Sequence, residues 1–461
     1  MRFARASAGT FVTQIVGCGL RIVIGALVAR ALGPEDKGVQ GVAVTMGLML
    51  VALGNAGLAQ AMVYFAGSRR GAPRELVGVG VLSALGLGAL VAALCWWQRT
   101  WILSLSSFRM VPPGVLAVAL LIPGAALLQA HLQGVVRGLK RIYWYNLNDL
   151  FVRVTNLAAV VVLLLGLHLG VRGAVVAQAI GWSVPAALTL YLLWREFGVS
   201  WRPTRELLRP LLSYGIRGHP QTAADFLNTY RLDVFVLSAF FAHRHEQVGY
   251  FLVAVVAAGL LWFICDAVGT VLLPVASAGT EADANRFTPL VCRHTLFLTA
   301  VAGAAMMLLA RPATGLVYSA KFLPAVPVIL VLVPGFVVYS ISRVLVRDLA
   351  GRGRPLVPSV AIVVNQAVSL ALDFWLIPRM GILGAGVAYS VACLVGTAIV
   401  LPAFLLRSKV SLSETLLIRR SDFAVYRRAW QTLRGAPGAA PESTAPDTDP
   451  TPLDTTPSEL Q

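Results

Sequence analysis

Apolar runs of roughly 20 residues recur along almost the whole chain, separated by short breaks that carry Gly, Pro and Arg. A helix needs about this length to cross the hydrocarbon core of a bilayer. The segment must be helical because its backbone groups have to pair within it. The composition agrees, with 57% hydrophobic and 13% charged residues and a mean hydropathy of +0.75. The chain is therefore predicted to be an all-α polytopic membrane protein.

We predict about twelve transmembrane helices from these runs. The loops between them are too short to hold a catalytic domain, so we expect a protein that is not an enzyme and has no catalytic residues. The first run is longer than the apolar core of a secretory signal and contains Arg21, so we expect it to be retained. The predicted spans are 8–31, 38–66, 76–97, 115–136, 146–167, 171–194, 211–241, 249–276, 289–310, 323–345, 356–377 and 383–406.

The formal net charge of +17 is distributed in a way that argues against nucleic acid as a partner. Basic residues gather in alternate loops, as the positive-inside rule describes, so both termini are expected on the cytoplasmic side. Such loops also attract anionic membrane lipids. The cytoplasmic set includes Arg69, Arg70, Arg74, Arg137, Lys140, Arg141, Arg195, Arg202, Arg205 and Arg209.

Metal and disulfide chemistry are not expected. The five cysteines show no paired spacing, and most lie inside apolar runs. His243 and His245 flank Arg244 in a short loop without a further ligand beside them. We therefore predict no metal site and no cofactor, apart from a Na⁺ or H⁺ that could drive transport.

Two pairs of segments share one sequence offset. Gly38 and Gly249 each open a helix after a charged loop, and they lie 211 positions apart (249 − 38 = 211). The stretch HLGVRGAVVA from His168 aligns with RMGILGAGVA from Arg379 at the same offset. Two distant matches at one offset indicate a duplication.

The duplication predicts two six-helix lobes related by a pseudo-two-fold along the membrane normal. In transporters built this way the substrate lies between the lobes, which rock against each other. The predicted lobes are residues 1–206 and 207–408, joined by a polar cytoplasmic linker at 195–209. Residues 409–461 are predicted to form a cytoplasmic tail, first basic and lying on the inner leaflet, then rich in Pro, Ala and Thr and disordered.

Several stretches resemble the bacterial polysaccharide transporters, the Wzx-type oligosaccharide flippases. They are ARALGPEDKGVQGVAVTMGLMLVALGNAGLAQAMVYFAG, LQGVVRGLKRIYWYN, the block YRLDVFVLSAFFAHRHEQVGYFLVAVVAAGLLWFICDAVGTVLLP, and GILGAGVAYSVACLVGT, which together cover most of residues 8–406. The resemblance implies the fold of the multidrug/oligosaccharidyl-lipid/polysaccharide exporter superfamily. It also implies export of a lipid-linked oligosaccharide across the bacterial cytoplasmic membrane, beside glycosyltransferases and a polysaccharide polymerase.

Arg21 lies near the middle of the first run, where a charge costs about 2.5 to 3.5 kcal/mol and needs a partner or water. Gln14 and Thr10 fall on the same helical face and, with Gly17, form a polar and small-residue stripe. One interpretation is that Arg21 lines the inter-lobe cavity and contacts the diphosphate of the substrate. The other is a structural pair with a carboxylate elsewhere.

The seventh run carries a polar ridge of Asp225, Asn228 and Arg231 at three-residue steps. The 211 offset places Arg21 opposite Leu232, so both lobes carry an arginine at nearly the same position. Arg231 and Asn228 are candidates for lining the cavity. Asp225 is a candidate for substrate or ion contact, or for a structural salt bridge.

The remaining charges near or within the runs have functional or structural interpretations. Asp266 could couple transport to an ion gradient, or pair with Arg21 or Arg231. Arg343 and Arg347 could snorkel to the interface or form a phosphate-receiving cytoplasmic entrance. Asp149 and Arg153 are predicted to form a local ion pair, and Asp373 is predicted to be solvated near an outer helix end.

Three alternative functions remain open at this point. A drug or cation antiporter of the same superfamily is disfavoured by a cationic cavity. A membrane glycan ligase or polymerase would need a long outer loop that the sequence does not contain. A scaffold without transport activity is the third. The segment LGPEDKG is expected to be an outer hairpin with Pro34 at a helix start, rather than a site.

Overall fold

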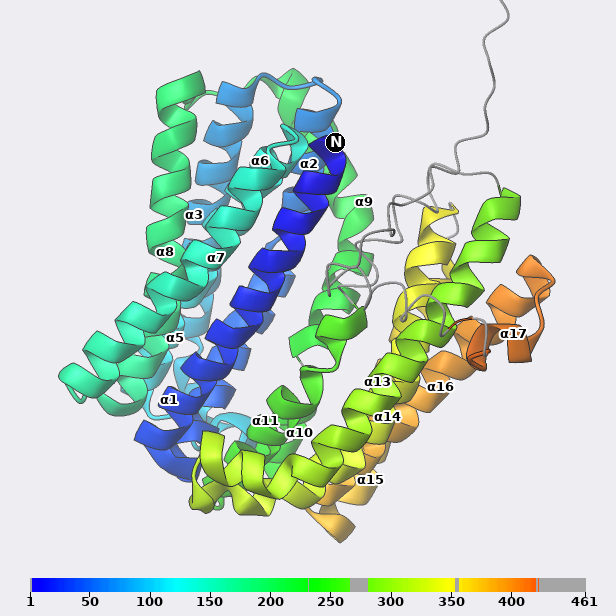
Figure 1. Cartoon of the computed structure of the whole chain (residues 1–461). Helices are drawn as coiled ribbons and strands as arrows, with labels where there is room; N and C mark the ends of the chain where they lie inside the picture. Colours follow the sequence, from blue (N-terminus) through cyan, green and yellow to red (C-terminus); the bar gives the residue numbers. More distant parts are fainter. Residues whose placement is uncertain (1, 231, 266–280, 353–355, 420–421, 423–461) are drawn as a thin grey trace, which may run out of the picture. The chain divides into compact units, whose positions relative to one another are not determined.

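A computed structural model describes residues 2–230, 232–265, 281–352, 356–419 and 422, with the side chains of 2–12, 220–230, 281–284, 286 and 350–351 outside that description. Within these ranges every regular element is a helix (Figure 1), which confirms the predicted all-α class. The described residues up to 416 form one compact unit. The helices are α1 (Arg2–Gly54), α2 (Leu58–Gly67), α3 (Pro73–Trp97), α4 (Arg99–Ser104), η1 (Ser106–Phe108), α5 (Pro113–Ala119), α6 (Leu121–Gly138), α7 (Ile142–Val160), η2 (Val161–Gly166), α8 (Gly170–Phe197), α9 (Arg205–Tyr230), α10 (Asp233–Phe240), α11 (His245–Gly259), α13 (Glu281–Val317), η3 (Ala320–Ala325), α14 (Val326–Gly351), α15 (Leu356–Met380), α16 (Ile382–Ser408) and α17 (Leu412–Leu416).

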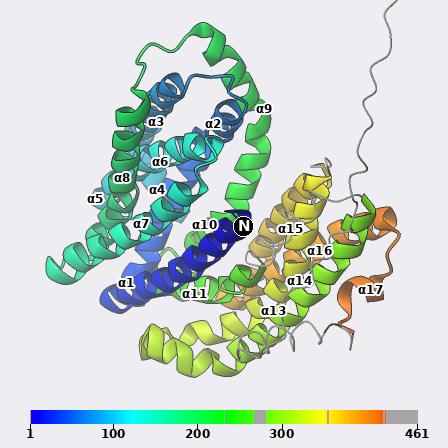
Figure 2. The same ribbon diagram turned by 45° about the horizontal axis from the view of Figure 1, so that its top comes forward.

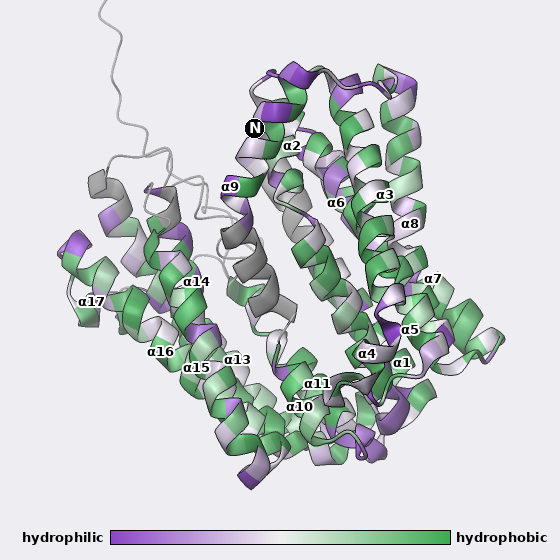
Figure 3. Cartoon of the chain, turned by 180° about the vertical axis from the view of Figure 1, so that it is seen from behind, coloured by the Kyte–Doolittle hydropathy of each residue, from purple (hydrophilic) through white to green (hydrophobic). Residues whose placement is uncertain are grey.

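Ten helices of the described chain are long and apolar enough to cross a membrane, so the protein is multi-pass. Figure 3 shows hydrophobic residues along the lengths of the helices. The first of the ten, Thr13–Gly54, contains most of two predicted runs, and the predicted run 211–241, now α9 and α10, is not among them. The number of twelve therefore stays a prediction.

α1 consists of two helical segments that meet at Gly33. Its φ of 74° lies in the left-handed region that favours glycine, and Pro34 follows at the start of the second segment. The 42 residues of Thr13–Gly54 would extend about 63 Å as one straight helix, twice the hydrocarbon thickness. The charged stretch in the first predicted loop is thus a break within α1.

The predicted run 38–66 is also interrupted, between α1 and α2. Gly57 has a φ of 70°, and the Asn55 side-chain oxygen accepts a hydrogen bond from the Ala59 amide at 3.3 Å. The same oxygen lies 3.2 Å from Nε2 of His131, which is fully buried on α6. A buried polar group therefore supports the break, which periodicity alone does not reveal.

The two copies of the second repeated motif share a local conformation. Gly170 begins α8 with a φ of 56°, and Gly381 precedes α16 with a φ of 64°. A Cβ on Gly173 or on Gly384 would press against the backbone carbonyl of a nearby residue, Leu163 or Leu376 respectively. The duplication is thus visible in backbone geometry, while the division into two lobes stays a prediction.

The largest apolar core joins the two halves of the sequence, which we call the N-half (residues 2–197) and the C-half (residues 205–416). Val42 on α1 and Val175 on α8 belong to the same buried cluster as Phe251 on α11 and Phe336 on α14. Figure 2 shows α7 beside α1 and α8, with which it shares contacts. Large apolar side chains such as Leu308 are exposed, as expected for surfaces that face lipid.

The first residues of the predicted tail are helical. α17 packs against α13, where Arg293 donates a hydrogen bond to the carbonyl oxygen of Glu414 at 3.3 Å. The compact unit thus extends to Leu416, eight residues beyond the predicted end of the second lobe at 408 (416 − 408 = 8).

Candidate functional site

A four-residue segment after α11, Trp262–Cys265, gathers arginines from distant parts of the chain. On α14, Arg343 places its guanidinium 4.7 Å from the centre of the Trp262 ring. Arg347, one turn further, donates a hydrogen bond to the Cys265 carbonyl oxygen at 3.3 Å. The i, i+4 spacing brings both cations to the same face of α14.

Arg21 reaches the same segment from α1. Its guanidinium carbon lies 4.9 Å from the centre of the Phe263 ring, and the residue is exposed within the first candidate span. An aromatic face attracts a guanidinium through its quadrupole. We call Arg21, Arg343 and Arg347, together with Trp262–Cys265, the arginine cluster. The sequence predicted a cavity arginine and a separate entrance pair, and the structure brings them to one place.

The polar stripe before Arg21 has mixed surroundings. Gln14 is partly buried, and a Cβ on Gly17 would lie 3.1 Å from the guanidinium carbon of Arg153 on α7. Arg153 also pairs with Asp149, which confirms the predicted local ion pair. The stripe therefore packs on α7 at Gly17, and cavity lining by Arg21, Gln14 and Thr10 stays a prediction.

Other predicted site residues cannot be placed in the arginine cluster. The side chains of Thr10 on α1 and of Asp225 and Asn228 on α9 lie outside the described residues. Arg231 and Asp266 lie outside them altogether. Asp266 directly follows Cys265 in sequence, so it remains a candidate neighbour of the arginines.

Two buried carboxylates were not assigned a role in the predicted site. Asp373 on α15 is 0% exposed and Asp233 on α10 is 2% exposed, and these two helices contact each other. The expectation that Asp373 is solvated is therefore wrong. It lies near a helix end, but α15 turns that face inward, and no sequence signal gives the rotation of a helix against its neighbours.

The N-half and the C-half approach each other closely just after Gly33. A Cβ on Gly38 would overlap the carbonyl oxygen of His245, and a Cβ on Gly249 would overlap that of Pro34. Arg30 donates hydrogen bonds to the carbonyl oxygens of Leu316 and Val317 at the end of α13, the latter at 2.8 Å. These contacts hold α1 against α11 and α13.

Two further groups near this contact are polar. Nδ1 of His245 lies 3.9 Å from a carboxylate oxygen of Glu35. Tyr318 follows α13 directly, and burial raises the pKa of its phenol to about 12, so the phenol stays neutral at physiological pH. The segment LGPEDKG is thus part of a contact between the halves, in addition to the predicted turn.

A family model described as polysaccharide biosynthesis protein matches residues 4–279. The chain belongs to this family. An uncharacterized membrane protein of Methanocaldococcus jannaschii is 25% identical over 188 residues. That match spans 40% of this chain and 37% of the relative, so it covers little more than a third of that protein.

Solved structures show that this polysaccharide biosynthesis family member has the fold of the MOP superfamily. The lipid II flippase MurJ in an inward closed conformation has a TM-score of 0.72 at 16% identity, covering 93% of each chain. An inward-facing multidrug resistance MATE family transporter has a TM-score of 0.69 at 16% identity, covering 87% of this chain and 98% of that one. A MOP superfamily transporter from Pyrococcus furiosus has a TM-score of 0.60 at 14% identity, covering 88% and 95%.

Proposed function

We propose that the chain is a flippase that carries a lipid-linked oligosaccharide across the cytoplasmic membrane, and that the arginine cluster binds the diphosphate of this substrate. One observation carries the proposal: Arg21 of the N-half and Arg343 and Arg347 of the C-half all contact Trp262–Cys265. Guanidinium groups bind phosphate oxygens through charge-assisted hydrogen bonds, often in pairs. A diphosphate fits such a cluster.

Family and fold support the same function. The family model is that of polysaccharide biosynthesis proteins, and a structural neighbour flips lipid II, as its name states. A substrate of this kind is amphipathic, so its charged head needs a polar path while its lipid tail stays in the bilayer. Glycosyltransferases and a polymerase would supply and consume it on the two sides, with both termini of the chain in the cytoplasm.

Transport would then require the contact near Gly33 to open. In the alternating-access mechanism one half rocks against the other around a fixed site. In this structure α1 contacts α11 there, and Arg30 on α1 bonds to the last carbonyl oxygens of α13. Asp225 and Asp266 stay proposed as residues that couple the movement to Na⁺ or H⁺.

A drug or cation antiporter of the same fold is the second candidate. Its substrate would approach three guanidinium groups that repel a cation, so the arginine cluster disfavours it. A ligase has still less support, because the described connections between helices are short.

Flipping in liposomes tests the proposal. Purified full-length protein is reconstituted with a fluorescent polyprenyl-diphosphate glycan, and the fraction of headgroups reached by an external lectin is followed over time. Arg343→Ala is expected to slow flipping at least about tenfold, the effect of losing one charged contact. Equal rates for wild type and Arg343→Ala would contradict the proposal.

Arg379→Ala is the matched control. Arg379 also stacks on a tryptophan, with its guanidinium 4.9 Å from the centre of the Trp375 ring, and it donates to the Trp375 carbonyl oxygen at 2.6 Å. It lies in the last turn of α15, away from the arginine cluster. Arg379→Ala removes the same kind of contact and should leave flipping unchanged.

A further inference from the structure

A cavity of about 580 Å³ lies within the N-half, between α6, α7 and α8. Its wall is mainly apolar. Trp144 and Leu147 of α7 and Leu188 of α8 line it and are 46%, 39% and 42% exposed. The cavity therefore opens sideways between α7 and α8, onto a surface that faces lipid in a membrane.

A polar side chain in the cavity wall lacks a hydrogen-bond partner among the described residues. Gln133 on α6 is only 7% exposed, and neither its amide nitrogen nor its amide oxygen has a hydrogen-bond partner within the described part of the chain. A buried amide without a partner costs free energy, so such groups mark sites where something else binds. Gln133 also lines a second cavity of about 350 Å³ toward α1.

The polar groups beside Gln133 are already engaged with one another. Asn148 on α7 donates to the Thr189 hydroxyl at 2.6 Å, and Thr189 donates to the Pro185 carbonyl oxygen at 2.8 Å. The side-chain nitrogen of Gln129 donates to the Asn148 oxygen. These bonds fix Asn148 and Thr189 across the cavity. Among the residues that line it, Gln133 is the one whose buried side-chain atoms lack a partner in the described part of the chain.

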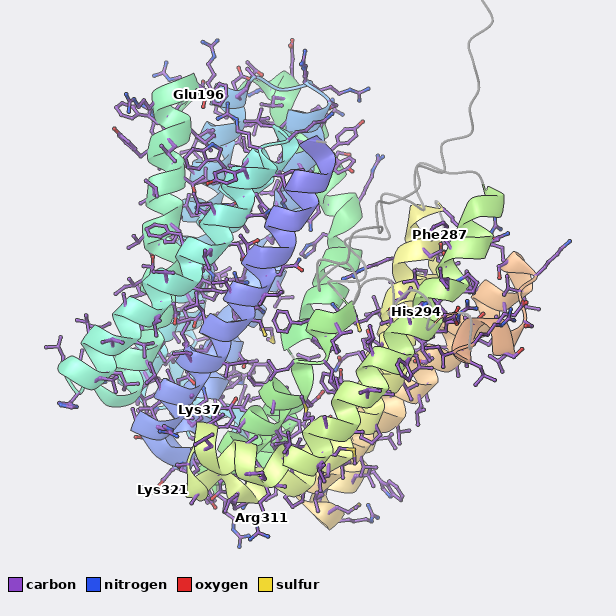
Figure 4. All side chains as sticks on the ribbon, viewed as in Figure 1. Lys37, Glu196, Phe287, His294, Arg311 and Lys321 are labelled. Atoms are coloured by element: carbon purple, nitrogen blue, oxygen red, sulfur yellow. The ribbon has the colours of Figure 1, made fainter. Side chains whose placement is uncertain are left out.

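Charged residues surround the mouth of the cavity. Arg141 pairs with Glu196, and this hydrogen bond raises the pKa of Arg141. Glu196 lies at the end of α8, opposite the end of the fold that carries Lys37 and Lys321 (Figure 4). Arg195 lines the cavity beside this pair and is exposed, so the mouth carries two cations and one anion. The helical rise places Asn148 and Thr189 about 10 Å deeper than these charges.

We propose that this cavity binds an anionic diacylglycerophospholipid from the leaflet on the Glu196 side. An acyl chain lies between α7 and α8, an ester carbonyl oxygen accepts a hydrogen bond from the Gln133 amide nitrogen, and the phosphate lies near Arg195 and Arg141. The excess positive charge at the mouth matches an anionic headgroup. A polyprenyl chain is pure hydrocarbon and would leave the Gln133 amide unsatisfied, so the site is distinct from that of the proposed transport substrate.

Photolabelling of the purified full-length protein tests the site. The probe is phosphatidylglycerol with a diazirine in one acyl chain, and labelled peptides are mapped by mass spectrometry. We expect saturable labelling of peptides from α7 and α8 that unlabelled phosphatidylglycerol competes away. Labelling that does not saturate, or that spreads evenly over all helices, would overturn the proposal.

Two substitutions on one face of α8 provide the sharpest comparison. Leu188→Trp fills the mouth and should reduce labelling about tenfold, whereas Val184→Trp, one turn away, is similarly exposed and does not line the cavity. Equal labelling of these two variants would contradict the proposal. Gln133→Leu keeps the packing apolar and should weaken competition by phosphatidylglycerol about tenfold, the effect of losing one buried hydrogen bond.

The choice of competitor identifies the ligand class. Competition by phosphatidylglycerol but not by polyprenyl phosphate supports the proposal. Competition by polyprenyl phosphate alone would make the cavity part of the transport path and overturn it. Equal competition by phosphatidylcholine would overturn the requirement for an anionic headgroup. None of these outcomes depends on flipping, so they separate this site from the proposed function.

Discussion

Gly38 and Gly249 contact each other reciprocally across the two halves of the chain. The group that a Cβ on Gly38 would strike is the His245 carbonyl, and for Gly249 it is the Pro34 carbonyl. Gly38 and Gly249 differ by 211 positions, and so do Pro34 and His245 (245 − 34 = 211). This is the reciprocity of a two-fold interface, in which residue i contacts j and j contacts i. The predicted pseudo-two-fold axis would pass through this contact.

The first prediction concerns this contact. Gly249→Ala places a methyl group against a backbone carbonyl that cannot move without shifting α1, so it should destabilise the structure by about 1 to 3 kcal/mol. Gly38→Ala should have a similar effect by symmetry. Thermal unfolding in detergent measures both. Gly25→Ala is the control on α1, because a Cβ there meets nothing within 4 Å, and an unchanged melting temperature in all three variants would refute the close contact.

The second prediction concerns Arg30. Its hydrogen bonds to Leu316 and Val317 reach the last carbonyls of α13, where a cation is favourable. Arg30→Ala should lower the free energy of unfolding by about 1 kcal/mol. Arg30→Lys should retain part of the stabilisation that Arg30 provides. Arg99→Ala is the comparison, since within the described part of the chain the Arg99 side chain donates a hydrogen bond only locally, to the Trp96 carbonyl oxygen at 3.1 Å. If both alanine variants melt alike, Arg30 does not join the halves.

The third prediction compares two Asp–Arg pairs with the same i, i+4 spacing. Asp348 and Arg352 have side chains only 3% and 11% exposed, with Asp348 also accepting from the Thr288 hydroxyl at 2.7 Å. Asp348→Asn leaves Arg352 buried with a weaker partner and should cost about 3 kcal/mol.

The exposed pair of Asp149 and Arg153 is the control for the buried pair. The Asp149 side chain is 49% exposed in its pair with Arg153, so Asp149→Asn should cost less than about 1 kcal/mol. Melting temperatures of Asp348→Asn and Asp149→Asn measure this difference in stability. A larger loss for Asp149→Asn than for Asp348→Asn would show that burial does not set the strength of these pairs.

The sequence predicts the all-α membrane class and much of the order of the helices, because apolar runs of membrane length have few alternative structures. The sequence does not predict features that depend on how the helices pack against each other. The break at Asn55–Gly57 depends on His131, which lies 76 residues away. Asp373 is buried because α15 turns it toward its neighbours. Arg21 and Arg343 share one segment only because α1, α14 and the segment after α11 converge, and helical periodicity gives no angle between helices.

The last prediction tests whether Arg21 and Arg343 act on one ligand. Their guanidinium groups stack on consecutive residues, Phe263 and Trp262. If both bind the same diphosphate, Arg21→Ala and Arg343→Ala should each reduce flipping while the protein still inserts, and the double variant should lose less than the product of the two effects, because contacting residues are not additive. Arg21→Lys should recover part of the activity, since it restores charge without the planar fork.

The repeat extends this test to Arg231, which lies one residue from the position matching Arg21 and is proposed to act with it. Arg231→Ala is expected to reduce flipping with normal membrane abundance. If Arg21 or Arg231 only pairs with Asp225 or Asp266, a single substitution should instead lower abundance, because it leaves a charge unpaired at membrane depth. Removing both partners would then restore abundance and flipping together. Measuring both quantities for each single and double variant separates the two readings, and joint recovery in a double variant would rule out substrate contact by that arginine.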